Sequence, residues 1–229
     1  MSRMFKGCYN LESIDLSNFR TDNAKTISLM FADAGNLTEL DLSNFRTENI
    51  EDIEGMFYGC ENLKKINLSS FNTKNLERIN WLFYGCYSLT SINITNFNTS
   101  KVYRAGNLFS NCRSLTSIDV SHMDTSNMEH MRGMFSGCTN LLSINLSNFN
   151  TSKVVDMSDM FAYCYNLQYL DLSSFDTKNV ESMYMMFFNC SNLKTVDVSS
   201  FNTEKVAFFN GMLEKCIFRN FKYHKFCPL

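Results

Sequence analysis

The sequence predicts an α/β solenoid in which each 26-residue unit supplies one parallel strand and one short helix. Three observations predict it: a motif at constant spacing, a stretch with strand periodicity in each unit, and a second stretch with helical periodicity. A fixed period of this length is typical of solenoids, whose units bury their apolar faces against their neighbours. The motif, Met-Phe-x-Gly-Cys-x-Asn-Leu in consensus, begins once in every unit, at Met4, Met30, Met56, Leu82, Leu108, Met134, Met160, Met186 and Met212.

The strand is predicted from the unit that covers residues 134–159. Ile144 and Leu146 alternate with polar neighbours, which is the periodicity of a half-buried strand. The longer pattern Leu141-x-x-Ile144-x-Leu146-x-x-Phe149 matches the leucine-rich-repeat frame except at its last position. Eight equivalent strands are expected between residues 14 and 198.

The helix is predicted immediately after the strand. Asn150, Thr151 and Ser152 are suited to a turn and to capping a helix N-terminus. An apolar stripe with helical spacing follows at Val154, Met157, Met160 and Phe161. One unit earlier, Gly137 sits where such a helix should end in a left-handed residue, and Asn111 and Asn189 occupy the same place in other units.

Strands joined through helices are expected to lie parallel, with right-handed crossovers. Parallel strands are about 4.8 Å apart, whereas a helix needs roughly 10 Å. We therefore expect a concave strand side, with an arc on the order of 35 Å for seven such spacings, and a convex helix side.

The sequence of the repeats resembles that of the BspA-like leucine-rich-repeat surface proteins, whose units have the same length. The resemblance is carried by strings such as MFAYCYNLQYLDLSSFDT at 160–177 and covers residues 4–216. It implies a surface protein of bacteria or some protists that is adhesive or of unknown function, without catalytic residues. In place of the asparagine of ordinary leucine-rich repeats, this chain has an expected apolar spine at Phe19, Phe45, Phe71, Phe97, Met123, Phe149, Phe175 and Phe201.

The unbroken period predicts one domain over residues 1–216, with eight full repeats and a partial ninth, followed by a cap or tail at 217–229. The net charge is −2, and residues 215–229 carry four bases and no acid, namely Lys215, Arg219, Lys222 and Lys225. A cap is the favoured interpretation of the tail, and a segment that contacts membrane or nucleic acid is the alternative. Residues 1–214 have a net charge of −6, which is unsuited to binding nucleic acid.

The sequence contains no apolar run long enough to span a membrane and no signal-peptide pattern. The first unit begins without its helical segment, which would leave the core beside Leu11, Ile14 and Leu16 uncovered. Terminal repeats normally need a polar cap. We therefore expect the chain to be part of a longer protein.

Cysteines recur in one slot of the repeat, and Ala34 fills that slot in one unit. This favours free thiols packed in the core over a column of disulfides or a thiolate metal array. The spacing of His122, His130 and Cys138 invites a metal site, but the fold is expected to separate them. No metal or cofactor is therefore expected. The slot holds Cys8, Cys60, Cys86, Cys112, Cys138, Cys164, Cys190 and Cys216.

Polar side chains should form columns on the strand side, which suits a polar partner such as a protein or glycan. The alternative is that these columns only solvate the sheet. One column is Asp15, Asp41, Asn67, Asn93, Asp119, Asn145, Asp171 and Asp197; another is mixed and contains Tyr169 as its aromatic member. We expect any binding site to include Tyr169, Asp171, Asp197, Asp119 and Ser173.

No catalytic constellation stands out, so the sequence does not predict an enzyme. It predicts a recognition or adhesion module at the cell surface or secreted, with a cytoplasmic scaffold or effector as the alternative.

Overall fold

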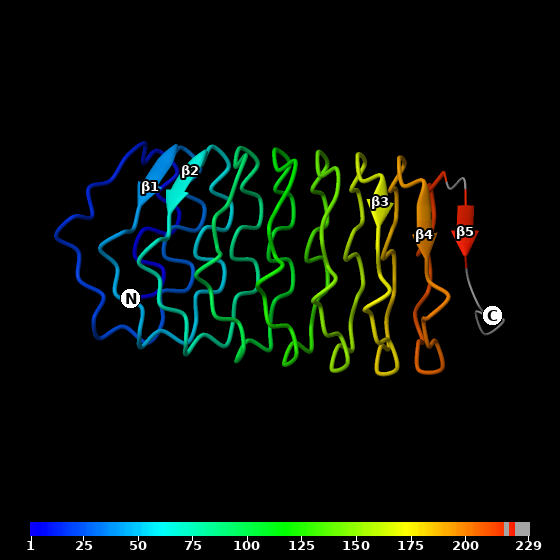
Figure 1. The fold of residues 1–229 in the computed structure, drawn as a ribbon. Helices are drawn as coiled ribbons and strands as arrows, with labels where there is room; N and C mark the ends of the chain where they lie inside the picture. The colour runs from blue at the N-terminus through cyan, green and yellow to red at the C-terminus, as the bar shows by residue number, and fades with distance from the viewer. Residues whose placement is uncertain (218–219, 223–229) are drawn as a thin grey trace.

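The computed structural model describes residues 1–217 and 220–222, which form successive coils standing side by side from the N-terminus to the C-terminus (Figure 1). The strands form two sheets, in the orders β1-β2 and β3-β4-β5, and every strand pair is parallel. Four of the eight expected strands are therefore present in the described residues, and the parallel arrangement is confirmed. The strands are β1 (Glu39–Asp41), β2 (Lys65–Asn67), β3 (Tyr169–Leu170), β4 (Thr195–Asp197) and β5 (Asn220–Lys222).

The predicted helix is wrong: the described residues contain none. Where it was expected, alternate backbone amides donate to carbonyls of the next coil. The amides of Met157, Asp159 and Phe161, for example, donate over 3.0, 2.8 and 2.9 Å to carbonyls of the coil that follows. One parallel β-bridge per coil runs through the same segment without a gap, joining Thr26, Asp52, Arg78, Arg104, His130, Asp156, Ser182 and Phe208.

Tight turns occupy the residues between these bonds. In the unit that contains Gly133 and Gly137, the amide of Met134 bonds to the carbonyl of Met131, and that of Cys138 bonds to Phe135. Gly133 and Gly137 have φ values of 60° and 70°, which places a left-handed residue third in each turn, as in a type II turn. Asn111 and Asn189, with φ of 61° and 60°, confirm the predicted left-handed position. The conformation serves a turn and not a helix cap.

The predicted curvature loses its basis with the helix, because it depended on a helix being wider than a strand. We call the side formed by residues 39–43 and their equivalents the strand face. The turn face is formed by residues 26–35 and their equivalents. Hydrogen bonds join successive coils directly on both faces, and the turn face carries the more continuous ladder.

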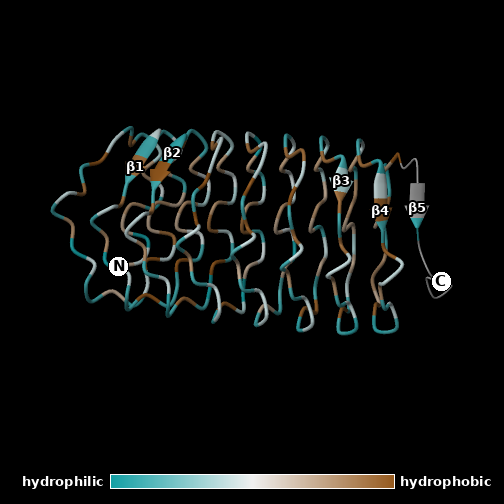
Figure 2. Cartoon of the chain, in the orientation of Figure 1, coloured by the Kyte–Doolittle hydropathy of each residue, from teal (hydrophilic) through white to brown (hydrophobic). Residues whose placement is uncertain are grey.

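The core lies between the two faces, and polar and apolar residues alternate along every coil (Figure 2). The predicted spine is confirmed, since its residues from Phe45 to Phe201 are buried and Phe19 is partly buried. A second column was not predicted as a spine. Its rings stack on the next coil with centroids 5.3 to 6.2 Å apart, through Phe5, Phe31, Phe57, Phe83, Phe109, Phe135, Phe161 and Phe187.

Buried threonines join the coils at the end of the strand face. Thr151 was predicted to cap a helix, but its hydroxyl donates to the carbonyl of Asp176 in the next coil over 2.9 Å. The same oxygen accepts the amide of Asp176 over 2.8 Å. One buried hydroxyl thus satisfies two backbone groups. The hydroxyl-to-carbonyl bond repeats at Thr21, Thr47, Thr73, Thr99, Thr125, Thr151 and Thr177.

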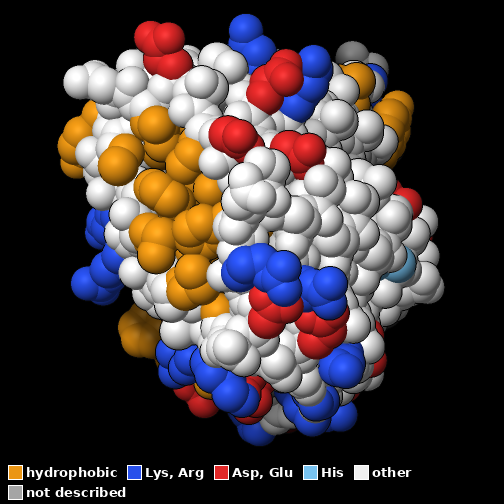
Figure 3. All heavy atoms as spheres, turned by 90° about the vertical axis from the view of Figure 1, so that its left-hand side faces the viewer, with side chains coloured by type: hydrophobic (Ala, Val, Ile, Leu, Met, Phe, Trp, Pro, Cys, Tyr) orange, Lys and Arg blue, Asp and Glu red, His pale blue; other side chains and the backbone are white. Residues whose placement is uncertain are grey.

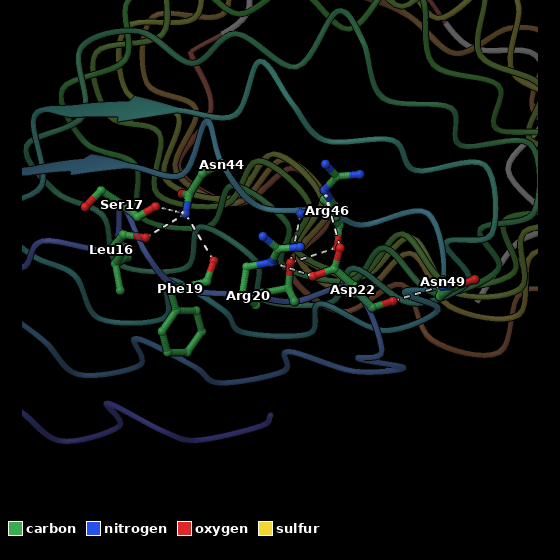
Figure 4. A network of polar contacts seen from close by, with 9 residues as sticks. Leu16, Ser17, Phe19, Arg20, Asp22, Asn44, Arg46 and Asn49 are labelled. Atoms are coloured by element: carbon green, nitrogen blue, oxygen red, sulfur yellow. Dashed lines mark hydrogen bonds and ion pairs between the residues drawn. The ribbon is translucent and has the colours of Figure 1, made fainter.

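Asparagine side chains form a comparable link between the first coils (Figure 4). The side-chain amide of Asn44 donates to the carbonyls of Leu16 and Phe19 over 2.6 and 3.1 Å. The side-chain amide of Asn49 donates to the carbonyl of Asp22 over 3.1 Å. Many of the repeated polar side chains therefore hydrogen-bond to neighbouring coils and are not available to a ligand.

The six column cysteines from Cys60 to Cys190 are buried, as predicted, whereas Cys8 is exposed and Cys216 is only partly buried. Each buried thiol donates to a phenylalanine carbonyl of the preceding coil, as Cys138 does to Phe109 over 3.2 Å. Burial raises the pKa of the Cys60 and Cys138 thiols to about 12. Such thiols are poor nucleophiles, because the thiolate is the reactive form.

We expect the stability of the fold to decrease as the pH rises above 9. The pKa of Cys138 is higher in the folded chain than its ordinary value of 9.0, so the unfolded chain binds fewer protons there. The contribution of the Cys138 thiol to the free energy of unfolding is complete below pH 9 and is lost as the pH approaches 12. At pH 10 the loss is on the order of 1 kcal/mol for each such thiol.

Urea unfolding at pH 7 and pH 10 measures this loss. Cys138→Ala should lose less stability than the unmodified chain between the two pH values, by an amount on the order of 1 kcal/mol. Ala34 is fully buried in the same slot, so the substitution has a natural precedent in the fold. An equal loss in both proteins would show that Cys138 does not carry the effect.

The two ends of the stack differ. At the N-terminal end, apolar side chains gather in one exposed patch (Figure 3). Met4 and Tyr9 are exposed, and Leu11 and Ile14 are only partly buried, as predicted, whereas Leu16 is buried with 5% of its surface exposed. At the C-terminal end, β5 adds one strand beside β4. Most of the predicted cap at 217–229, including Arg219 and Lys225, lies outside the described residues.

Candidate functional site

The predicted binding residues are all exposed on the strand face. Tyr169 begins β3, and its backbone is in register with Thr195 of β4. Asp171 and Asp197 occupy equivalent positions in those two coils, while Asp119 lies two coils before Asp171. Tyr169, Asp171 and Asp197 are therefore brought together, Ser173 follows Asp171 on the same coil, and Asp119 is separated from them.

The column of Asp and Asn residues from Asp15 to Asp197, called the aspartate column below, forms hydrogen bonds to the backbone. An oxygen of Asp171 accepts the backbone amide of Ser173 over 2.9 Å, which turns the chain at the end of the strand. This hydrogen bond lowers the pKa of the Asp171 carboxyl. The same bond to the residue two positions on occurs at Asp15, Asp41, Asn67, Asn93, Asp119, Asn145, Asp171 and Asp197. One oxygen of each of these side chains is thus occupied.

Tyr169 is an exposed aromatic residue of this face, with 57% of its surface open to solvent. The ammonium of Lys194, in the next coil, lies 5.4 Å from the centre of its ring. The same ammonium donates to Gln168 over 3.1 Å. Tyr169 therefore presents an aromatic ring beside one cation and the carboxylates of Asp171 and Asp197.

A groove of about 460 Å³ lies elsewhere on the strand face, beside β1 and β2. Two of its charged groups pair with each other, since Lys65 bonds to Glu39 over 2.9 Å. The side-chain amide of Asn67 likewise donates to Asp41 over 2.9 Å. These four side chains are therefore partly occupied by one another.

The turn face holds aromatic residues that the sequence interpretation missed. Trp81 is 43% exposed and borders a cavity of about 550 Å³, which we call the Trp81 hollow. The ring of Tyr58 also lines this cavity and stacks on Tyr84 at 4.8 Å with 4° between the planes. These residues were missed because their positions had been assigned to a helix. A signal was available: Trp81 is the single tryptophan of the chain.

The histidine and cysteine side chains whose spacing invited a metal site lie apart. Cys138 is in the core and His130 is in the bridge ladder of the turn face. Both ring nitrogens of His122 are buried without a hydrogen-bond partner. Within the described residues, no three His, Cys, Asp or Glu side chains are grouped so that they could hold a metal ion.

Comparison with known families identifies the chain. The family model described as "Mycoplasma protein of unknown function, DUF285" matches residues 1–90, 52–168 and 107–226. The chain belongs to this family. The overlapping matches follow the repeat along nearly the whole DUF285 chain. None of the curated proteins compared with it matches.

Solved structures similar to this DUF285 protein include two bacterial leucine-rich-repeat proteins. One from Bacteroides ovatus is 20% identical, with a TM-score of 0.43, over 77% of this chain and 48% of its own. One from Eubacterium ventriosum is also 20% identical, with a TM-score of 0.45, over 85% and 41%. The DUF285 chain thus spans about half of their length or less. At this level of similarity they say nothing about its ligand.

No described part of the chain is a helix able to cross a membrane.

Proposed function

We propose that this DUF285 chain is a non-catalytic recognition module that binds a protein or glycan through its strand face, at a cell surface or in a secreted protein. One observation supports this most. Repeated polar side chains, such as Thr151 and the aspartate column, bond to the backbone, while other exposed positions vary from coil to coil. A fixed scaffold with varied exposed positions is suited to binding.

The site proposed for this function comprises Tyr169, Asp171 and Asp197, with Ser173 beside them and Asp119 at its edge. Tyrosine gives a large contact area together with a hydroxyl, which is why it is frequent at interfaces. The carboxylates of Asp171 and Asp197 add hydrogen-bond acceptors next to the ring. Lys194, which lies over the ring, adds a donor that the sequence interpretation did not include.

Tyr169→Ala is expected to weaken binding of the partner by about 2 kcal/mol or more, since a central aromatic anchor typically contributes that much. The partner is first found by screening protein and glycan arrays, and its affinity is then measured by calorimetry.

The matched control is Tyr184→Ala. Tyr184 is 36% exposed on the turn face, and its substitution should leave binding unchanged. Ser158, on the same face, is no suitable control, because it is only 4% exposed and its hydroxyl bonds to Ser182 over 2.7 Å. Weaker binding by Tyr184→Ala together with full binding by Tyr169→Ala would refute the assignment to the strand face.

A further inference from the structure

The Trp81 hollow differs from the strand-face groove, in which Lys65 and Glu39 form an ion pair. Among the described residues, none of Arg3, Lys6 and Asp33 forms an ion pair. Glu54 accepts a hydrogen bond from the side-chain amide of Asn80, which orients its carboxylate from the next coil. Two cations and two carboxylates therefore border one cavity with their capacity for further hydrogen bonds largely unused.

Glycine residues make room for this cavity. A Cβ on Gly55 would lie 2.7 Å from the side chain of Leu29, so Leu29 extends across a backbone that carries no side chain. A Cβ on Gly59 would likewise lie 2.8 Å from a carboxylate oxygen of Asp33. Leu29 thus contributes an apolar part of the lining, with the Asp33 carboxylate beside it.

The backbone of Trp81 also departs from what its side chain favours. Its φ is 55°, in the left-handed region that is costly for a bulky residue. Gly55, Gly133 and Gly211 occupy the equivalent position in other coils, with φ between 57° and 68°. The fold therefore does not need a tryptophan there, and the exposed indole is unexplained by packing alone.

We propose that the Trp81 hollow binds a neutral oligosaccharide, which gives the recognition module a second site and rests on the proposed function. Arg3 and Lys6 disfavour a cation there, while Asp33 and Glu54 disfavour an anion. A purely apolar ligand would bury these charges without hydrogen bonds. Sugar hydroxyls both donate and accept, so a neutral sugar satisfies groups of either sign.

The aromatic residues give the same ligand a surface to lie on. The C–H face of a sugar ring packs against the exposed ring of Trp81 and the partly buried Tyr58, while its hydroxyls reach the charged rim. Tyr84 continues the aromatic surface into the next coil, because its ring is parallel to that of Tyr58. A ligand of several sugar units therefore fits the surface better than a single sugar.

The fluorescence of Trp81 gives a direct test, because it is the single tryptophan of the chain. The probes are maltohexaose, cellohexaose, mannohexaose and hexa-N-acetylchitohexaose, with tetramethylammonium and citrate as the cation and the anion. At least one neutral hexasaccharide should change the emission saturably and shield Trp81 from acrylamide, whereas the ions should not. A response to an ion alone, or to none of the probes, overturns the proposal.

Three variants test the assignment by calorimetry with the responding hexasaccharide. Trp81→Gly, which copies the residue of three other coils, should keep the melting temperature within a few degrees and weaken binding about 30-fold or more. Glu54→Gln should weaken it about tenfold, since a charged acceptor forms the stronger hydrogen bond. Tyr169→Ala should bind as the unmodified chain does.

Loss of hexasaccharide binding by Tyr169→Ala, with full binding by Trp81→Gly, would refute the Trp81 hollow while leaving the strand-face function intact. Loss of array binding by Tyr169→Ala, with no hexasaccharide response at Trp81, would also refute the Trp81 hollow and leave the strand-face function intact. Failure of the array screen together with a positive Trp81 response would instead refute the strand-face site.

Discussion

Phe135→Ala is expected to lower the free energy of unfolding by about 3–5 kcal/mol, the usual cost of removing a buried phenylalanine. The ring of Phe135 is fully buried and stacks between Phe109 and Phe161, at centroid distances of 5.7 and 5.8 Å. Its removal leaves a cavity in the middle of the column. Neighbouring coils lose contact on both sides, because each unit of a solenoid is stabilised by its neighbours.

Urea unfolding followed by circular dichroism measures this effect. Tyr184→Ala is the control, because it also removes an aromatic ring but from an exposed position, and it should cost less than about 1 kcal/mol. A loss below about 1 kcal/mol for Phe135→Ala would contradict the view that stacked phenylalanines hold the coils together.

Thr151→Val is expected to cost about 2–4 kcal/mol, although valine has nearly the same shape as threonine. The hydroxyl of Thr151 serves both the carbonyl and the amide of Asp176. Valine leaves both of these backbone groups unsatisfied next to the core, at about 1–3 kcal/mol for each buried group.

Thr151→Ser separates the hydroxyl from the methyl group. Serine keeps the donor and acceptor, so this variant should retain most of the stability that valine loses. The same urea titration compares the two. If Thr151→Ser were as unstable as Thr151→Val, the methyl group would be the important part of the side chain and the hydroxyl would not.

The sequence was informative wherever one residue type fills one slot. The constant period defined the coils, and the alternation around Ile144 and Leu146 correctly separated buried from exposed residues. The same alternation placed Tyr169 and Asp171 on the surface. It did not show that Asp171 bonds to the backbone of Ser173, because that contact depends on the local turn.

The helix prediction failed for a physical reason. Val154, Met157, Met160 and Phe161 have helical spacing, but a series of tight turns also buries residues at these intervals. The decisive signal was the pair Gly133 and Gly137. Two left-handed residues four positions apart are incompatible with a continuous right-handed helix. This conflict was not apparent while only Gly137 was interpreted, as the residue that ends a helix.

The same error hid the Trp81 hollow. On a convex helix, Trp81 would have been one exposed side chain among others. On a turn ladder, Trp81 and Gly55 occupy equivalent positions in adjacent coils. The large tryptophan side chain therefore lies beside a glycine, which has no side chain. The cavity depends on this register between coils, which the periodicity alone did not reveal.

Backbone chemical shifts of residues 152–164, measured by NMR, test the turn ladder most directly. A ladder with left-handed residues at Asp159 and Tyr163 predicts no continuous run of helical Cα shifts, and shifts typical of positive φ at those two residues. An uninterrupted series of helical shifts from Val154 to Phe161 would contradict it, and would restore the helix that the sequence pattern first indicated.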